Sequence, residues 1–363
     1  MRRSSQQQSA AKLIFYAADR FADTLHQQAV EEANWDEVRE AGGIDLLVSL
    51  LKLGPCRASA QAAAALTHLA HSAANRDAIR ESGGIALLVA LLTQPQQGSS
   101  PSLLLQPPYD WLETATNAAA ALRNLTHNNS DNQDAIREAR GVEPLIGLLS
   151  QGASSSAASR AADALGGLAR NTHRANQIAI REAGGIEQLV TLLHAQPIGE
   201  AATKAAGALK HLAFAYSVNR EAIREAGGIE PLVALLELRR DIEEDVMIIA
   251  GALWNLGYNN PYNQDSIREA GGVRCASACD GHHARDGGGR AELNPPAASA
   301  EAAPPPLPLR ARHARAGGES GARDGGRWPC AHAARVAHPA IPPSLSLSLS
   351  LRVPVLSLSL SLS

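Results

Sequence analysis

Apolar residues recur along the first three-quarters of this chain at the spacing of buried helix faces. One such run is residues 229–236 (IEPLVALL), and related runs begin at four glycines: GIDLLVSLL, GIALLVALL, GVEPLIGLL and GIEQLVTLL at Gly43, Gly84, Gly141 and Gly185. Each run follows a short polar segment and precedes a longer segment rich in Ala and Leu. The pattern predicts a unit of three helices, each apolar along one stripe.

The unit is repeated. Close copies of Ile-Arg-Glu-Ala-Gly-Gly begin at Val38, Ile79, Ile136, Ile180, Ile223 and Ile267, which are 41, 57, 44, 43 and 44 residues apart. A period in the low forties indicates helical units that bury their apolar stripes by stacking on neighbours. The 57-residue interval reflects an insertion near residues 94–110, whose Pro, Gln and Ser content predicts a loop between second and third helices.

Local signals predict where the short first helix of each unit begins and ends. We expect its first cap to be an asparagine, whose side chain accepts a hydrogen bond from a free backbone N–H: Asn34, Asn75, Asn132, Asn176, Asn219 and Asn263. The Gly pair then stops the helix in a left-handed conformation. Arg140 replaces the first Gly of the third copy, so we expect Gly141 to supply the positive φ alone.

These motifs resemble those of the armadillo-repeat family. The shared pattern is NxxAIxEAGGIxxLVxLL…AAxALxNL, and it covers roughly residues 11–273. The resemblance implies an all-α fold, a right-handed α-solenoid of three-helix repeats whose third helices line a concave groove that binds partner proteins, often as extended peptides. Two-helix HEAT-like stacking is the alternative architecture, which the Gly-Gly break after a separate short helix disfavours.

Four regions follow from the pattern. We expect a disordered N-terminus over residues 1–10 and a capping or partial repeat over 11–33. Residues 34–273 hold five full repeats and a truncated sixth. For residues 274–363 we expect a disordered low-complexity tail, because large apolar residues become scarce and the end alternates Ser and Leu. The abrupt change within a repeat suggests that this tail is a translated intron or a shifted reading frame.

The resemblance also predicts the groove residues. In the family, the Asn of the third-helix ALxNL motif points into the groove and pairs with a peptide backbone. The matching positions here, which we call the ladder positions, are His68, Asn124, Gly167, His211 and Asn255. The residues one step earlier are Thr67, Arg123, Gly166, Lys210 and Trp254. We therefore predict a partner-binding groove formed by Thr67, His68, Arg123, Asn124, Lys210, His211, Trp254 and Asn255.

Each of these assignments has a structural alternative. His68 and His211 could be ordinary solvated residues, and Asn124 and Asn255 could bond backbone inside the solenoid. Trp254 could pack against a helix of a sixth unit instead of a partner. The tryptophans that precede the Asn ladder in importin-like members are absent, since those positions hold Ala64, Ala120, Asp163, Gly207 and Gly251; this argues against binding of nuclear-localisation peptides.

Charge and motifs narrow the function further. The formal net charge of -3 divides into +4 for residues 274–363 and therefore -7 for residues 1–273, and an acidic repeat region disfavours a nucleic-acid groove. The sequence shows no phosphate-binding loop, HExxH or GxSxG motif, and we predict no catalytic residue, metal site or cofactor. Cys275, Cys279, His282 and His283 lack the spacing of an established zinc site.

We therefore expect a non-enzymatic interaction scaffold that binds a protein or extended peptide segment as a monomer. Alternatives are a substrate-recognition or adaptor subunit of a ubiquitin ligase and a vacuole- or membrane-associated armadillo adaptor, although no U-box or acylation signal is visible. The chain shows no membrane-spanning run. Its four cysteines form no disulfide framework, so we expect the cytoplasm, with the nucleus as the second compartment that the sequence allows.

Overall fold

The computed structural model describes residues 2–94, 111–152, 154–170, 173–195 and 199–272. All regular elements in these ranges are helices. The predicted insertion, apart from Gln94, and the predicted tail lie outside them, as does the final residue of the expected repeat region, Val273. Residues 2–10, for which we expected disorder, form the first turns of a helix (α1, Arg2–Val30); this segment contains neither Gly nor Pro and more than half of it is Arg and Gln, which favour helix.

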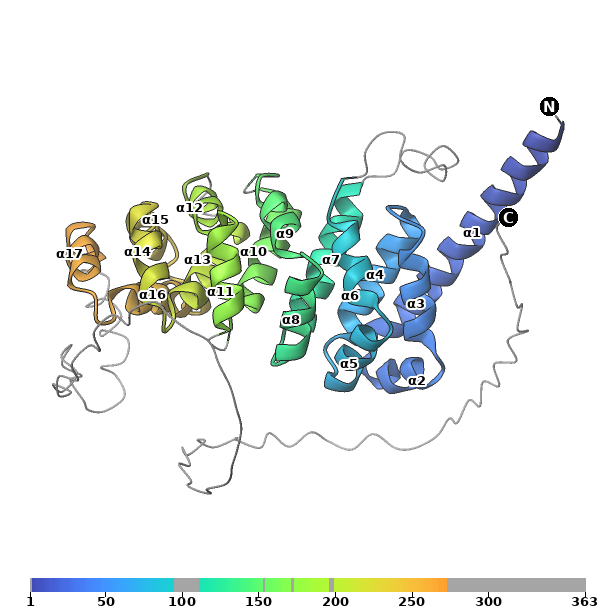
Figure 1. Cartoon of the computed structure of the whole chain (residues 1–363), viewed down its shortest axis with the longest axis horizontal. Helices are drawn as coiled ribbons and strands as arrows, with labels where there is room; N and C mark the ends of the chain where they lie inside the picture. Colours follow the sequence, from blue (N-terminus) through green and yellow to red (C-terminus); the bar gives the residue numbers. More distant parts are fainter. Residues whose placement is uncertain (1, 95–110, 153, 171–172, 196–198, 273–363) are drawn as a thin grey trace, which may run out of the picture. The chain divides into compact units, whose positions relative to one another are not determined.

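The helices fall into the three classes that the sequence predicts, and the units follow one another from α2 to α17 (Figure 1). The short first helices are α2 (Trp35–Glu40), α5 (Ala73–Glu81), α8 (Ser130–Glu138), α11 (Arg174–Glu182), α14 (Ser217–Glu225) and α17 (Pro261–Glu269). The second helices are α3 (Gly43–Leu51), α6 (Gly84–Leu91), α9 (Val142–Leu149), α12 (Gly185–Ala195) and α15 (Ile229–Leu238). The third helices are α4 (Arg57–Leu69), α7 (Trp111–Leu125), α10 (Ser156–Leu168), α13 (Glu200–Ala213) and α16 (Glu243–Gly257). A short 3-10 turn, η1 (Glu32–Asn34), joins α1 to α2.

Third helices form the main packing seam of the solenoid. Each one packs along the next, from α4 through α7, α10 and α13 to α16, and α1 packs along α4 in the same manner. Their buried faces consist largely of Ala, which lets the helices approach closely. Each helix from α4 to α13 in this row adds two fully buried leucines three residues apart: Leu66 and Leu69, Leu122 and Leu125, Leu165 and Leu168, and Leu209 and Leu212. Helix α1 thus occupies the place that the third helix of a preceding unit would have.

The two glycines of the repeated pair have separate roles. The first adopts the left-handed conformation, with φ of +76° at Gly42 and Gly184, and the second lies where a Cβ would collide with the first helix. At Gly185 that atom would come within 2.7 Å of Ile180 Cγ2. The prediction for the third copy was wrong: Arg140 itself adopts φ +57°, while Gly141 has φ −76° and is needed for space.

The prediction that the repeated asparagines cap the first helices was wrong. Asn34 occupies the cap position of α2, but its side chain donates to the Gln28 carbonyl at 3.2 Å and accepts no capping hydrogen bond. Asn75, Asn132, Asn176, Asn219 and Asn263 are each the third residue of a first helix and are fully buried. The Asn176 Nδ2 donates to the Leu168 carbonyl at 3.1 Å and to the Gln133 carbonyl at 3.5 Å, so one amide joins its own helix to the end of α10 and to the preceding first helix. A side chain that satisfies two buried carbonyls explains why Asn recurs here.

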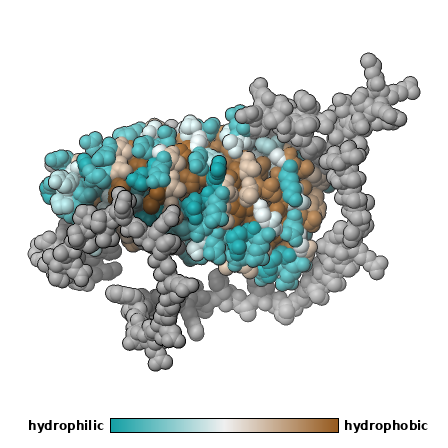
Figure 2. Space-filling model, viewed as in Figure 1, coloured by the Kyte–Doolittle hydropathy of each residue, from teal (hydrophilic) through white to brown (hydrophobic). Residues whose placement is uncertain are grey.

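Polar and apolar surface alternate over the repeat region. Figure 2 shows one face, on which apolar residues lie between groups of polar ones. The arginines after each buried Ile form ion pairs within their own first helix, such as Arg137 with Asp134 at 2.6 Å. These half-exposed pairs belong to the solvated surface of the array and contribute little to stability individually.

Candidate binding groove

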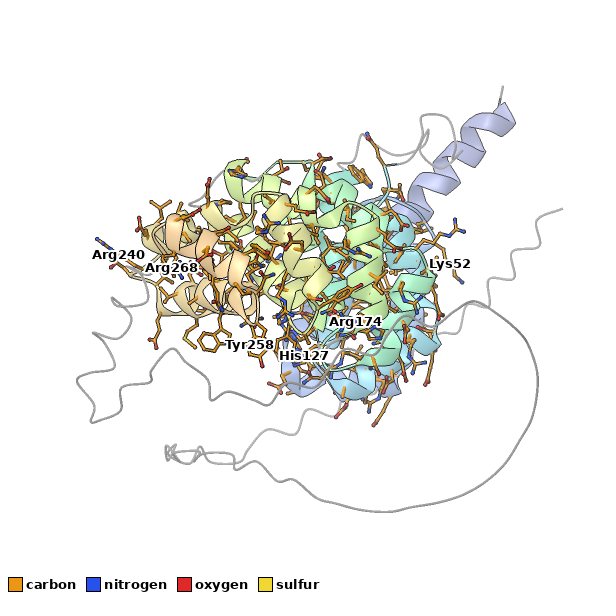
Figure 3. All side chains as sticks on the ribbon, turned by 60° about the vertical axis from the view of Figure 1, so that its left-hand side comes forward. Lys52, His127, Arg174, Arg240, Tyr258 and Arg268 are labelled. Atoms are coloured by element: carbon orange, nitrogen blue, oxygen red, sulfur yellow. The ribbon has the colours of Figure 1, made fainter. Side chains whose placement is uncertain are left out.

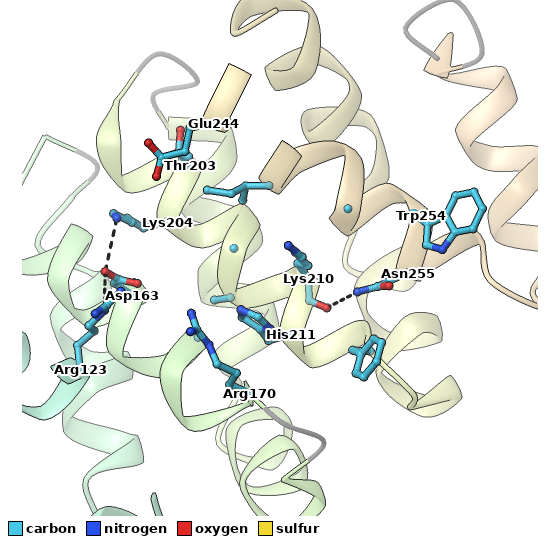
Figure 4. Close-up of a pocket in the computed structure, with 16 residues that line it drawn as sticks. Arg123, Asp163, Arg170, Thr203, Lys204, Lys210, His211, Glu244, Trp254 and Asn255 are labelled. Atoms are coloured by element: carbon cyan, nitrogen blue, oxygen red, sulfur yellow. Dashed lines mark hydrogen bonds and ion pairs between the residues drawn. The ribbon is translucent and has the colours of Figure 1, made fainter. Parts of the chain in front are cut away.

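A hollow opens across the third helices α7, α10, α13 and α16 (Figure 4). Its volume is about 660 Å³. Five of the eight predicted groove residues line it: Arg123, Lys210, His211, Trp254 and Asn255. The structure therefore brings most of the predicted set to one surface, although they come from three different units.

The hollow exists where small residues leave space on the third helices. Gly207 and Gly251 both line it, at the positions where importin-like members carry tryptophan. A Cβ at residue 251 would lie 3.0 Å from Lys210 Cε, so the missing side chain makes room for the stem of Lys210. At the neighbouring unit, a Cβ at residue 167 would overlap Thr126 and one at residue 166 would lie 3.2 Å from Ala208 Cα. The Gly166-Gly167 pair therefore interrupts the Asn ladder for a packing reason.

Asp163 organises one side of the hollow. Its Oδ2 lies 3.2 Å from Arg123 Nε and 3.5 Å from Lys204 Nζ, so one carboxylate on α10 pairs with cations from α7 and α13 (Figure 4). The sequence prediction included only Arg123 of these three. Lys204 lies seven residues, about two helical turns, before His211 on α13, a spacing that keeps both side chains on one face, so its position could have been inferred from helical spacing.

Arg170 and Lys210 form the other side of the hollow. Neither makes an ion pair in the part of the chain that the structure describes, and the buried Nε of Arg170 has no hydrogen-bond partner there. Arg170 was missed by the sequence prediction. It follows the ladder position Gly167 by three residues, a spacing that keeps a side chain on the same helix face, so the signal was present.

His211 lies beside these two cations. Burial lowers the pKa of its imidazole from 6.5 to about 4, and the positive charges of Arg170 and Lys210 act in the same direction, opposed by Asp163. The ring is consequently neutral near pH 7. Its own backbone carbonyl accepts a hydrogen bond from Gln177 Nε2 at 2.9 Å, which fixes the end of α13.

The two ladder asparagines also bond the solenoid backbone. Asn255 Nδ2 donates to the Lys210 carbonyl at 2.9 Å, and Asn124 Nδ2 donates to the Thr67 carbonyl at 2.8 Å. Asn124 is buried, and its Oδ1 accepts from Arg123 at 3.0 Å. Asn255 is only half-buried and lines the hollow, so its side chain is the more accessible of the two.

The remaining predicted residues lie outside the hollow. Thr67 donates to the Ala63 carbonyl of its own helix at 2.9 Å and faces α7, where the Asn117 carbonyl is 3.4 Å away. His68 packs against His26 of α1, with ring centroids 5.5 Å apart. Both therefore contact neighbouring helices.

Trp254 lies at the end of the third-helix row and is 62% exposed. In preceding units the equivalent side chain contacts the following third helix: Thr67 reaches Asn117, Arg123 pairs with Asp163, and Lys210 lies over Gly251. No following third helix is present in the described residues. The indole therefore borders the hollow on the last third helix that the structure describes.

Solved structures with similar folds identify the architecture. No model of a protein family matches the chain, and neither does any curated protein. An engineered protein from the Northeast Structural Genomics Consortium is 30% identical with a TM-score of 0.61; the match covers 74% of this chain, which spans 62% of that protein's length. A second engineered protein from the same source is also 30% identical, with a TM-score of 0.57 over 69% of this chain and 95% of the other.

Designed armadillo repeat proteins are also similar. One is 24% identical with a TM-score of 0.54, covering 65% of this chain and 92% of its own. Another, solved in complex with the peptide (KR)4, has a TM-score of 0.52 at 24% identity. The chain is thus an α-solenoid. More particularly, its fold is that of the armadillo repeat, as the motifs predicted. None of the helices in the described ranges is long and apolar enough to cross a membrane.

Proposed function

We propose that this chain is a non-enzymatic scaffold that binds an extended segment of a partner protein on its third helices. The observation that carries the proposal is the hollow of about 660 Å³ across α7, α10, α13 and α16. It is lined by cations, of which Arg170 and Lys210 make no ion pair within the described residues, by an accessible Asn and by an exposed Trp. An extended peptide backbone has free N–H and C=O groups along both of its edges, and an amide side chain can bind either kind because it has both donors and an acceptor.

The similar solved structures support this function. One designed armadillo repeat protein is described in complex with a peptide. A rigid row of packed helices is already ordered before binding, so little of the binding free energy is lost in ordering the receptor. Trp254 adds a large exposed aromatic surface, which is typical of residues that dominate binding energy.

Selection from a random peptide library tests the proposal. The full chain is used to enrich phage-displayed dodecapeptides, and the enriched peptides are tested on a Trp254→Ala/Asn255→Ala variant of equal helicity. We expect at least a tenfold loss of affinity in this variant. A matched control, Tyr262→Ala/Asn128→Ala, removes an exposed aromatic and an exposed amide that do not line the hollow and should leave binding within twofold. Enriched peptides that bind both variants equally well, or no enrichment at all, would overturn the proposal.

We further propose that the chain acts as a monomer in the cytoplasm, without nucleic acid. The buried free thiol of Cys56 is stable in a reducing compartment. The location of a fluorescent fusion of the full chain tests the compartment, and the sedimentation coefficient of the chain tests the monomeric state. The partner recovered with the chain would decide between a general scaffold and the ubiquitin-ligase or membrane-adaptor roles that the repeats also allow.

A further inference from the structure

Five rows of side chains cover the third helices around the hollow. Relative to the ladder residue of each helix they lie at −7, −4, −1, 0 and +3, and each row contributes residues to the hollow: Lys204 and Ile248, Gly207 and Gly251, Lys210 and Trp254, His211 and Asn255, Arg170 and Phe214. The same rows on α4, α7, α10, α13 and α16 therefore define the groove face.

The charge of this groove face is opposite to that of the repeat region as a whole. Its cations are Arg123, Arg160, Arg170, Lys204 and Lys210, and its one carboxylate is Asp163. Residues 1–273 carry a formal net charge of -7, as the difference between -3 for the chain and +4 for residues 274–363. Positive charge is thus concentrated on one face of an otherwise acidic array, and Glu244, at the first turn of α16, lies at the rim of the hollow.

Two of the five cations are paired and the others are not. Asp163 pairs with Arg123 and Lys204. Arg170, Lys210 and the exposed Arg160 make no ion pair within the described residues. Two of the cations also act on a histidine of this face: after burial, which is the main cause, Arg170 and Arg123 lower the pKa of His127, together with Arg76 of α5. An anionic ligand would relieve this repulsion between like charges.

We propose, resting on the proposed function, that the groove face binds an acidic extended segment of a partner protein, with its carboxylates held by Arg170 and Lys210. Guanidinium and ammonium groups bind carboxylates by charge-assisted hydrogen bonds. The neutral imidazole of His211 lies between the two cations and can accept or donate a hydrogen bond. The chain's own residues 274–363 are net basic, so their charge does not complement this face.

Three labelled peptides of equal length test the assignment: alternating Glu-Ser, Lys-Ser and Gln-Ser decapeptides, measured by fluorescence anisotropy with the full chain. We expect the Glu-Ser peptide to bind at least tenfold more tightly than the other two. Higher salt should weaken its binding, because exposed charges are screened.

Two double variants localise the effect. Arg170→Ala/Lys210→Ala should weaken binding of the Glu-Ser peptide at least tenfold. Lys52→Ala/Arg240→Ala removes the same two charge types at exposed positions that follow the second helices α3 and α15 (both labelled in Figure 3) and should leave binding within twofold. Charge reversal, Arg170→Glu/Lys210→Glu, should transfer the preference to the Lys-Ser peptide, provided that circular dichroism shows equal helicity.

Failure of this inference is distinguishable from failure of the proposed function. If the Glu-Ser peptide binds no more tightly than the other two, or if both alanine variants affect it equally, the acidic assignment is overturned. The scaffold function still stands in that case if peptides selected from the random library lose affinity in Trp254→Ala/Asn255→Ala. If those peptides bind that variant unchanged, both proposals fall.

Discussion

The interior of this solenoid and its groove face follow different rules. In the interior, the buried Asn, the buried Ile and the second Gly recur in almost every unit, because each satisfies the same backbone carbonyls or fills the same space. On the groove face, the ladder position changes from His to Asn to Gly along the array. The comparison shows that residues repeated in every unit maintain the fold, whereas positions that vary between units give this chain its own surface chemistry.

Removing an interior amide should have the largest effect on stability. Asn176→Ala loses hydrogen bonds to the Leu168 and Gln133 carbonyls in a fully buried site. We expect the free energy of unfolding to fall by about 2–4 kcal/mol. The groove amide is the matched comparison: Asn255→Ala should cost about 1 kcal/mol or less, because the site is half-exposed. Urea denaturation followed by circular dichroism measures both. Equal losses would erase the distinction between interior and groove.

Acidification should destabilise the array through His211. Its folded-state pKa of about 4 lies below the ordinary 6.5, so between these values the unfolded chain binds more protons and stability falls as pH falls. The loss is at most about 3 kcal/mol. Stability is measured at pH 7, 5.5 and 4.5 for the chain and for His211→Gln. A variant that loses as much stability as the parent would contradict this role.

Filling the space at a second glycine should cost less than losing the buried amide. In Gly185→Ala the new methyl group would come within 2.7 Å of Ile180 Cγ2 and 2.8 Å of its carbonyl oxygen, and we expect a loss of about 1–3 kcal/mol. Gly147→Ala is the control, since a Cβ at this helical residue meets no atom within 4 Å. Thermal denaturation distinguishes the two; a neutral Gly185→Ala would show that the helices can separate there.

The smallest effect is expected at Arg140, which replaces the first Gly of the repeated pair. Arg140 holds a left-handed conformation, φ +57°, that glycine adopts without steric cost. Arg140→Gly should therefore stabilise the chain by about 1 kcal/mol in urea denaturation. A loss of stability would mean that the arginine side chain contributes more than its strained backbone costs.

Much of the fold could be predicted from the sequence because it depends on periodic signals. Helical spacing and the Gly pairs located all three helix classes, since burial on one stripe and a left-handed stop leave direct marks in the residue pattern. The buried role of Asn176 and its equivalents could not be predicted this way. An Asn near a helix start fits a cap equally well, and only the three-dimensional path of the preceding helix places two carbonyls beside it.

The groove was predictable only in part. Resemblance identified Lys210, His211, Trp254 and Asn255 because they occupy or adjoin the ladder position. It missed Asp163 and Arg170. Asp163 lies within α10, four residues before the ladder position, and Arg170 lies just beyond the end of that helix. The hydrogen bond from Asn124 to the Thr67 carbonyl depends on the distance between α4 and α7. Small residues allow a close approach of two helices, but they do not determine that distance.

Photo-cross-linking tests the central claim most directly. A peptide selected on the full chain is synthesised with one benzoylphenylalanine, irradiated in complex, and its attachment sites are identified by mass spectrometry. The account predicts adducts on the groove face of α10, α13 and α16, at residues such as Lys210 and Trp254. Adducts confined to first or second helices, at residues such as Arg181 or Leu46, would contradict it.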